Sequence, residues 1–162
     1  MGRAPLWRRM TGKPAEVIRM PHLVSETRFT DGCSRCQKCV ERCETGVIVI
    51  GTGGFPELDF DKAECSFCGQ CAAACPEPLF LPAEDAPWPY AVALSDSCLT
   101  FKGIECRSCA DACEEAAIVF KPAIGISHPI LSTACTGCGA CLSRCPSQSL
   151  SLKQELKEPS HD

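Results

Sequence analysis

The stretch Cys65–Pro76, CSFCGQCAAACP, spaces its four cysteines as C-x2-C-x2-C-x3-C and closes with a proline. Three thiols at successive two-residue spacing suit a loop that wraps one compact iron–sulfur cube. A structural zinc ion instead favours two short cysteine pairs that are separated by a longer loop. The stretch therefore predicts an iron–sulfur cluster, and a zinc site or disulfides are the alternatives.

The same pattern recurs along the chain, whose 162 residues include sixteen cysteines. Similar runs begin at Cys33 (CSRCQKCVERC) and at Cys135 (CTGCGACLSRCP). A fourth run from Cys98 to Cys113, CLTFKGIECRSCADAC, ends in C-x2-C-x3-C but has seven residues between its first two cysteines. This internal repeat indicates two pairs of runs and therefore two similar modules.

Runs of this type are the signature of bacterial ferredoxins, in which the fourth cysteine of a run ligates the other cluster of a pair. Crossed pairing within each half of the chain uses every cysteine and predicts four [4Fe-4S] clusters. The predicted ligands are Cys33, Cys36, Cys39 and Cys75 for cluster 1; Cys65, Cys68, Cys71 and Cys43 for cluster 2; Cys98, Cys106, Cys109 and Cys145 for cluster 3; and Cys135, Cys138, Cys141 and Cys113 for cluster 4.

The long spacing in the third run raises the question of whether Cys98 ligates cluster 3. Cys98 is the cysteine left to complete the set, and a seven-residue loop containing Gly103 can return its thiol at a small entropic cost. In the alternative, three cysteines hold a cluster with an open iron and Cys98 is idle. Because the longer loop changes solvent access and hydrogen bonding to sulfur, we expect cluster 3 to differ in reduction potential.

The segments between the runs predict an α+β fold of two tandem bacterial-type 2[4Fe-4S] ferredoxin modules. Strand–turn–strand patterns follow Cys43 and Cys113. Gly69 and Gly139, each directly after a second cysteine, free the backbone to point N–H groups at sulfur. Strands are expected at 47–50, 57–60 and 91–94, and a helical turn at 71–75. The predicted organisation is a basic N-terminal segment 1–28, modules at 29–82 and 83–155 joined by a proline-rich connector, and a frayed tail 156–162.

The composition of the chain and its apolar segments indicate the cellular compartment in which the protein acts. About one residue in ten is a cysteine, a density otherwise typical of secreted disulfide scaffolds. No apolar segment long enough for a secretion signal follows the basic start, and Arg8–Arg9 lacks the apolar stretch of a twin-arginine signal. No window reaches the apolar length of a membrane span. We therefore expect a cytoplasmic protein with no membrane span.

Charge is uneven along the chain, whose formal net charge is −4. The segment 1–28 carries six Lys and Arg against two Asp and Glu, so it is either a docking segment or a solvated terminus. Four oxidised clusters would lower the net charge to about −12, which favours a basic partner surface and argues against nucleic acid. The sequence holds no nucleotide-binding glycine fingerprint and no catalytic triad context. We therefore expect no enzyme activity.

The whole chain resembles the NapF family, the ferredoxin-type accessory proteins of periplasmic nitrate reductase systems. The resemblance rests on RRMTG at 8–12, ECSFCGQCAAACPEPLF at 64–80, CTGCGACLSRCP at 135–146, and above all CLTFKGIECRSCADACEEAAIVF at 98–120 with its unusual gap. It implies a cytoplasmic protein with four [4Fe-4S] clusters that contacts the catalytic subunit of the periplasmic nitrate reductase before export of that subunit.

The resemblance further implies a role in maturation, in which the protein assembles or reduces the iron–sulfur centre of that subunit. Only the sixteen cysteines and, beside them, Arg8 and Arg9 match residues to which the family assigns a role. An electron-transfer polyferredoxin that feeds a reductase is the alternative. Cluster spacing does not distinguish a donor of iron and sulfide from a donor of electrons.

Overall fold

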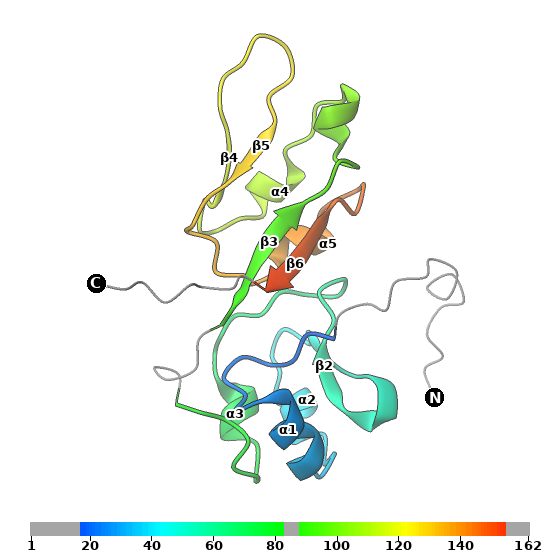
Figure 1. Cartoon of the computed structure of the whole chain (residues 1–162), viewed down its shortest axis with the longest axis vertical. Helices are drawn as coiled ribbons and strands as arrows, with labels where there is room; N and C mark the ends of the chain where they lie inside the picture. Colours follow the sequence, from blue (N-terminus) through cyan, green and yellow to red (C-terminus); the bar gives the residue numbers. More distant parts are fainter. Residues whose placement is uncertain (1–16, 83–87, 155–162) are drawn as a thin grey trace.

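The computed structural model describes residues 17–82 and 88–154, and it places two small modules one above the other along the long axis of the molecule (Figure 1). Arg8, Arg9 and the predicted tail 156–162 lie outside the described residues, as does the middle of the connector. None of the helices in the described ranges has the length and hydropathy of a membrane span.

Short antiparallel strand pairs frame each module. Within the described residues, six strands form three two-stranded sheets. Two of these sheets are hairpins that follow the first and third cysteine runs, whereas the third joins the beginning of the second module to its end (Figure 1). The pairs are β1 (Ile48–Ile50) with β2 (Pro56–Leu58), β4 (Ile118–Phe120) with β5 (Pro129–Leu131), and β3 (Tyr90–Leu94) with β6 (Leu150–Gln154).

The expected strands at 47–50 and 91–94 are confirmed to within one residue. β2 ends at Leu58, two residues before the predicted end of the return strand. Phe60, just beyond it, is buried, and its ring lies where any side chain on Gly139 would have to go. This residue therefore leaves the hairpin for a contact with the other module, which its local pattern did not indicate.

One-turn helices carry the third cysteine of every run. The turn expected at 71–75 is present, but it begins one residue earlier and ends two residues earlier, at Gln70–Ala73. These helices are α2 (Lys38–Glu41), α3 (Gln70–Ala73), α4 (Ser108–Asp111) and α5 (Ala140–Ser143). A longer helix, α1 (Glu26–Gly32), precedes the first run, and its N-terminus is capped by the Ser25 hydroxyl, which accepts from the backbone N–H of Arg28. Short 3-10 helices occupy the β1–β2 turn and the long gap of the third run, η2 (Thr52–Gly54) and η3 (Leu99–Lys102).

The described end of the basic segment, residues 17–28, packs into the first module. Val24 donates its backbone N–H to the carbonyl of Leu79 at 3.0 Å, so this segment pairs with the end of the module much as β3 pairs with β6. Arg19 forms an ion pair with Glu26 at 2.8 Å and stacks over the ring of Phe29. The charge of Arg19 is thus engaged within the module, and Met20 beside it is buried.

Aromatic residues join the two modules. The indole N–H of Trp88 donates to the carbonyl of Gly137 at 3.3 Å. The Trp88 ring lies 5.8 Å from that of Phe67 and 4.8 Å from that of Tyr90. Trp88 and Tyr90 therefore pack between the modules.

Candidate metal centres

The sixteen cysteines gather in four groups, and each group surrounds one cavity. The groups coincide with the four predicted ligand sets, and all sixteen residues are free thiols in the structure. The cavities have empty volumes of about 300 to 420 Å³. They are lined by Cys33, Cys36, Cys39 and Cys75 at site 1; Cys43, Cys65, Cys68 and Cys71 at site 2; Cys98, Cys106, Cys109 and Cys145 at site 3; and Cys113, Cys135, Cys138 and Cys141 at site 4.

Cys98 faces the same cavity as Cys106, Cys109 and Cys145, despite the long spacing of its run. It is buried, with 8% of its surface exposed. The turn of η3 and Gly103, which has a φ of +79°, return the chain toward Cys106. The structure therefore brings Cys98 together with the other three cysteines of site 3.

The arrangement of the thiols fits a polynuclear cluster. In the described ranges, no three Cys, His, Asp or Glu side chains form a group that could hold a single metal ion. The four sulfurs of each site instead stand around an open cavity, whereas a structural zinc ion needs four ligands directed at one point. The donor set of four soft thiols matches the ligands of a [4Fe-4S] cluster.

Thiols from the two runs of one module lie close enough to affect one another. Burial raises the pKa of Cys39 to about 11, and the thiolates of Cys33 and Cys75 add to the shift. Burial likewise raises the pKa of Cys141 to about 12, and Cys113 from the other run of its module adds to that shift. The fourth cysteine of one run thus lies beside the other run, as crossed pairing requires.

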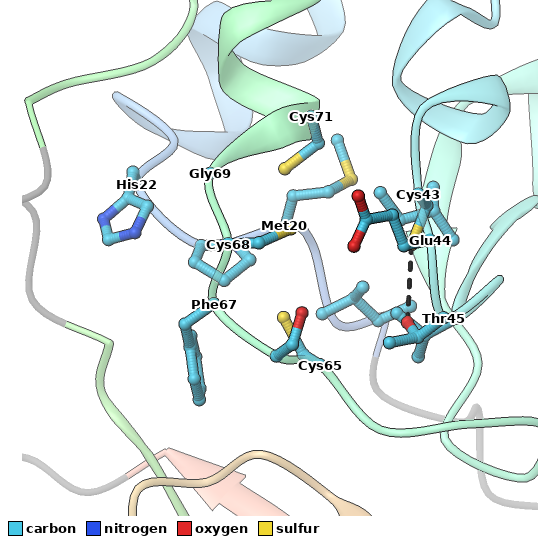
Figure 2. A pocket seen from close by; sticks show the side chains of 15 residues that line it. Met20, His22, Cys43, Glu44, Thr45, Cys65, Phe67, Cys68, Gly69 and Cys71 are labelled. Carbon is cyan, nitrogen blue, oxygen red and sulfur yellow. Dashed lines mark hydrogen bonds between the residues drawn. The ribbon is translucent and has the colours of Figure 1, made fainter.

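Site 2 shows how the two runs meet (Figure 2). Cys43 reaches the cavity from the end of the first run, whereas Cys65, Cys68 and Cys71 come from the loop and helix of the second. Burial raises the pKa of Cys71 to about 12. The hydroxyl of Thr45 lies 3.5 Å from the sulfur of Cys43.

Met20 was not indicated by any pattern in the sequence, yet it lines the cavities of both site 1 and site 2. Only 3% of its surface is exposed. Its thioether therefore fills the space between the two sites of the first module, which gives part of the N-terminal segment a structural role.

The loops that carry the first two cysteines use left-handed backbone at equivalent positions. Positive φ occurs two residues after the first cysteine and directly after the second in the three closely spaced runs. Such turns point successive N–H groups to one side and form anion-binding concavities. The residues are Arg35 and Gln37, Phe67 and Gly69, and Gly137 and Gly139. In the third run Arg107, the residue after Cys106, has a φ of −132°, so this loop is built differently.

Hydroxyl groups close to sulfur are the feature that sequence reasoning missed. Thr45 follows Cys43 by two residues, and the same spacing recurs in Cys98-x-Thr100 and Cys145-x-Ser147. The hydroxyl of Thr100 lies 3.3 Å from the sulfur of Cys98. A serine or threonine two residues after a ligand was the available signal, but spacing alone does not show whether the hydroxyl turns inward.

Comparison with known proteins agrees with this geometry. The 4Fe-4S dicluster domain matches residues 32–78 and again residues 102–149. The ferredoxin-type protein NapF of Escherichia coli is 43% identical over 136 residues, which cover 83% of each chain. The chain belongs to the NapF family of ferredoxin-type proteins. A NapF protein of Haemophilus influenzae is also 43% identical, over 143 residues that cover 87% of this chain and 81% of the relative.

The NapF family has more distant ferredoxin-type relatives. The ferredoxin-type protein NapG of Escherichia coli is 28% identical over 159 residues, covering 84% of this chain and 69% of NapG. The two dicluster matches establish the α+β fold of tandem ferredoxin modules and imply [4Fe-4S] clusters as the cofactors of this NapF-family protein.

Proposed function

We propose that this NapF-family protein holds four [4Fe-4S] clusters, one in each cysteine-lined cavity, with the ligand sets given above. The observation that carries the proposal is the grouping of all sixteen cysteines into four sets of four, with none left over. Cys98 is then the fourth ligand of cluster 3. The modules at 29–82 and 83–155 each hold two clusters.

We further propose that the protein acts in the cytoplasm on the precursor of the periplasmic nitrate reductase catalytic subunit. In this role it assembles or reduces the iron–sulfur centre of that subunit before export, and it has no substrate of its own. The family membership supports this proposal. An acidic protein that becomes more negative when its clusters are bound also suits a basic surface on the partner.

Electron transfer is the second candidate function, and one contact favours it. The backbone N–H of Cys65 at site 2 donates to the carbonyl of Cys138 at site 4 at 2.8 Å. This hydrogen bond joins two cluster sites across the module interface. Electrons could therefore pass from one module to the other, as a carrier that feeds a reductase requires.

The two functions are separated by purifying the nitrate reductase catalytic subunit from cells with and without this protein. If the protein is a maturation factor, the subunit from deficient cells lacks its cluster iron and is inactive with an artificial electron donor. If the protein is a carrier, the subunit is fully loaded and active with that donor, but nitrate reduction in the cell stops. Complementation of the deficient cells with Cys71→Ala tests the loss of one proposed ligand. Complementation with Ser97→Ala, which alters no proposed ligand, is its matched control.

A further inference from the structure

Site 3 is surrounded by side-chain hydroxyls. Ser149 lies 3.2 Å from the sulfur of Cys145, and Ser147 lies 3.6 Å from the same sulfur. Ser147 also donates to the hydroxyl of Ser149 at 3.2 Å, so it holds Ser149 in place. With Thr100 beside Cys98 and Ser108 at 3.7 Å from the sulfur of Cys106, three of the four sulfurs of this site have a hydroxyl neighbour.

The other sites have fewer such neighbours. Site 2 has Thr45 beside Cys43, and site 1 has Ser34, which lowers the pKa of Cys36 as one of its hydrogen-bond partners. No side-chain hydroxyl donates to a cysteine of site 4 in the hydrogen bonds found for the described ranges. The hydroxyl groups beside three sulfurs are therefore particular to site 3 and do not follow from the repeated fold.

The internal repeat allows site 3 to be compared with site 1 at equivalent positions. Cys75 closes site 1 as Cys145 closes site 3, and the residues that follow show the same alternation of exposed and buried positions. The two inward positions hold Glu77 and Leu79 after Cys75, but Ser147 and Ser149 after Cys145. Ser149 is buried, with 3% of its surface exposed, as is Leu79 with 5%. One buried position is thus apolar at site 1 and carries a hydroxyl at site 3.

The long gap of the third run supplies the second buried hydroxyl. Thr100 lies in η3 and is among the most deeply buried side chains, with 2% of its surface exposed. A buried hydroxyl is costly unless it forms a hydrogen bond, and the sulfur of Cys98 is the partner within reach. The closely spaced runs have no residue that corresponds to Thr100.

A thiolate bound to iron has no proton, so the hydroxyls of Thr100, Ser108 and Ser149 donate to sulfur. Ser147 gives its one proton to Ser149 instead and thereby orients that hydroxyl. Reduction of one cluster takes up a single electron from an external donor such as dithionite, which is itself oxidised. No bond forms or breaks, but the cluster and its thiolates gain one negative charge. Donors to sulfur stabilise this more negative state. At site 1 the backbone of Glu77 donates to Cys75, but its side chain is a carboxylate whose charge opposes the more negative state, where Ser147 at the equivalent position of site 3 is uncharged.

We propose that the hydroxyls of Thr100 and Ser149 give cluster 3 the highest reduction potential of the four clusters. An electron that enters the protein would then come to rest in cluster 3. Thr100 and Ser149 act here as positioning residues, because they influence the cluster through the sulfur atoms. The proposal rests on the four-cluster assignment made above, but it does not depend on the identity of the partner.

The test is an EPR-monitored redox titration of the anaerobically purified, full-length holoprotein, in which iron content is measured first. We expect Thr100→Val and Ser149→Ala each to move the component with the highest midpoint potential to a more negative value and to leave the other components in place. The expected change is roughly tenfold in the ratio of reduced to oxidised cluster, or about 59 mV for a one-electron couple. Thr100→Ser should restore most of the wild-type value.

Two controls fix the interpretation. Ser97→Ala removes a hydroxyl next to Cys98 that, among the described residues, forms a side-chain hydrogen bond with Ser95 and with no cysteine, so it should leave every potential unchanged. Thr45→Val should move a different component, that of cluster 2. If Thr100→Val does not load with iron, Ser149→Ala tests the same site independently.

Several results would overturn the proposal. These are a shift in a component of lower potential, an equal shift in Ser97→Ala, or no shift in Ser149→Ala when all four clusters are present. If the iron content of the wild-type protein corresponds to three clusters, the four-cluster assignment is wrong. The inference about cluster 3 is then also wrong if Cys106→Ala, which removes a proposed ligand of cluster 3, lowers the iron content no further.

Discussion

The backbone N–H of Cys65 donates a 2.8 Å hydrogen bond to the carbonyl of Cys138, and these two residues belong to different modules. Cys138 also contributes to raising the pKa of Cys65, after burial and the nearer thiolates. Sites 2 and 4 therefore meet at the interface between the modules. The packing of Phe60 on Gly139, which also joins the two modules, can be tested by mutation.

Gly139→Ala should weaken the module interface, and Gly69→Ala is its matched control. Both glycines follow a second cysteine and have positive φ, so alanine costs about 1–2 kcal/mol of backbone strain at either position. At Gly139 the methyl group would also overlap the buried ring of Phe60, whereas at Gly69 it meets open space. We expect Gly139→Ala to lower the free energy of unfolding by a further ~1–3 kcal/mol.

Thermal unfolding of the iron-loaded variants, followed by circular dichroism under anaerobic conditions, measures this difference. Equal losses of stability in Gly139→Ala and Gly69→Ala would show that the Phe60 contact contributes nothing to holding the modules together.

Cys98→Ala should lower the iron content by one cluster at most and leave the two clusters of the first module intact. The reason is that Cys98 lines the cavity of site 3, which belongs to the second module. Iron analysis combined with EPR spectroscopy checks this result, and Cys36→Ala provides the comparison in the first module. If Cys98→Ala retains the full iron content with unchanged spectra, Cys98 is not a ligand.

Removal of iron should unfold the protein. The buried core of each module is small, and many of its partly buried neighbours are the cysteines themselves. In modules of this size the binding free energy of the metal becomes folding free energy. Incubation with a chelator under reducing conditions should abolish the circular dichroism signal of the strand pairs, and reconstitution should restore it. A chelated protein that keeps its native spectrum would contradict this expectation.

Acidification should release iron from sites 2 and 4 before site 3. Burial raises the pKa of Cys71 and of Cys141 to about 12, so below that pH a proton competes with iron for each thiolate. At site 3 burial also raises the pKa of Cys109, but without reaching a value as high as at Cys71 and Cys141. Burial acts in the same direction on Cys145, but there the hydrogen bonds from Ser149 and Ser147 outweigh it and the net shift of the pKa is downward. A thiol with the lower pKa loses its proton more readily, so it keeps iron to a lower pH.

Iron release and EPR spectra recorded over a descending pH series measure this order. Loss of the highest-potential component before the others would contradict it. Ser149→Ala should bring the acid sensitivity of site 3 closer to that of the other sites, because it removes one of the hydrogen bonds that lower the pKa of Cys145.

Ligand spacing made much of this protein predictable. A C-x2-C-x2-C loop is too short to direct its thiols anywhere except around one centre, and sixteen cysteines leave few ways to divide them. The strands at 47–50 and 91–94 follow from local apolar patterns that depend on neighbouring residues alone. Such features are encoded locally, so the chain reveals them without its tertiary structure.

Other features depend on which distant segments meet. The packing of Val24 on Leu79, the burial of Phe60 over Gly139 and the place of Met20 between two sites each join residues far apart in the chain. The repeat pattern could not show that Ser149 is a buried hydroxyl donor at the position where the first module has Leu79, because inward orientation depends on packing. The sequence by itself determined which four thiols gather around each of the four cavities. Only the tertiary structure decided which sites adjoin and which sulfurs receive hydrogen bonds, because both depend on contacts between modules and on the direction of side chains.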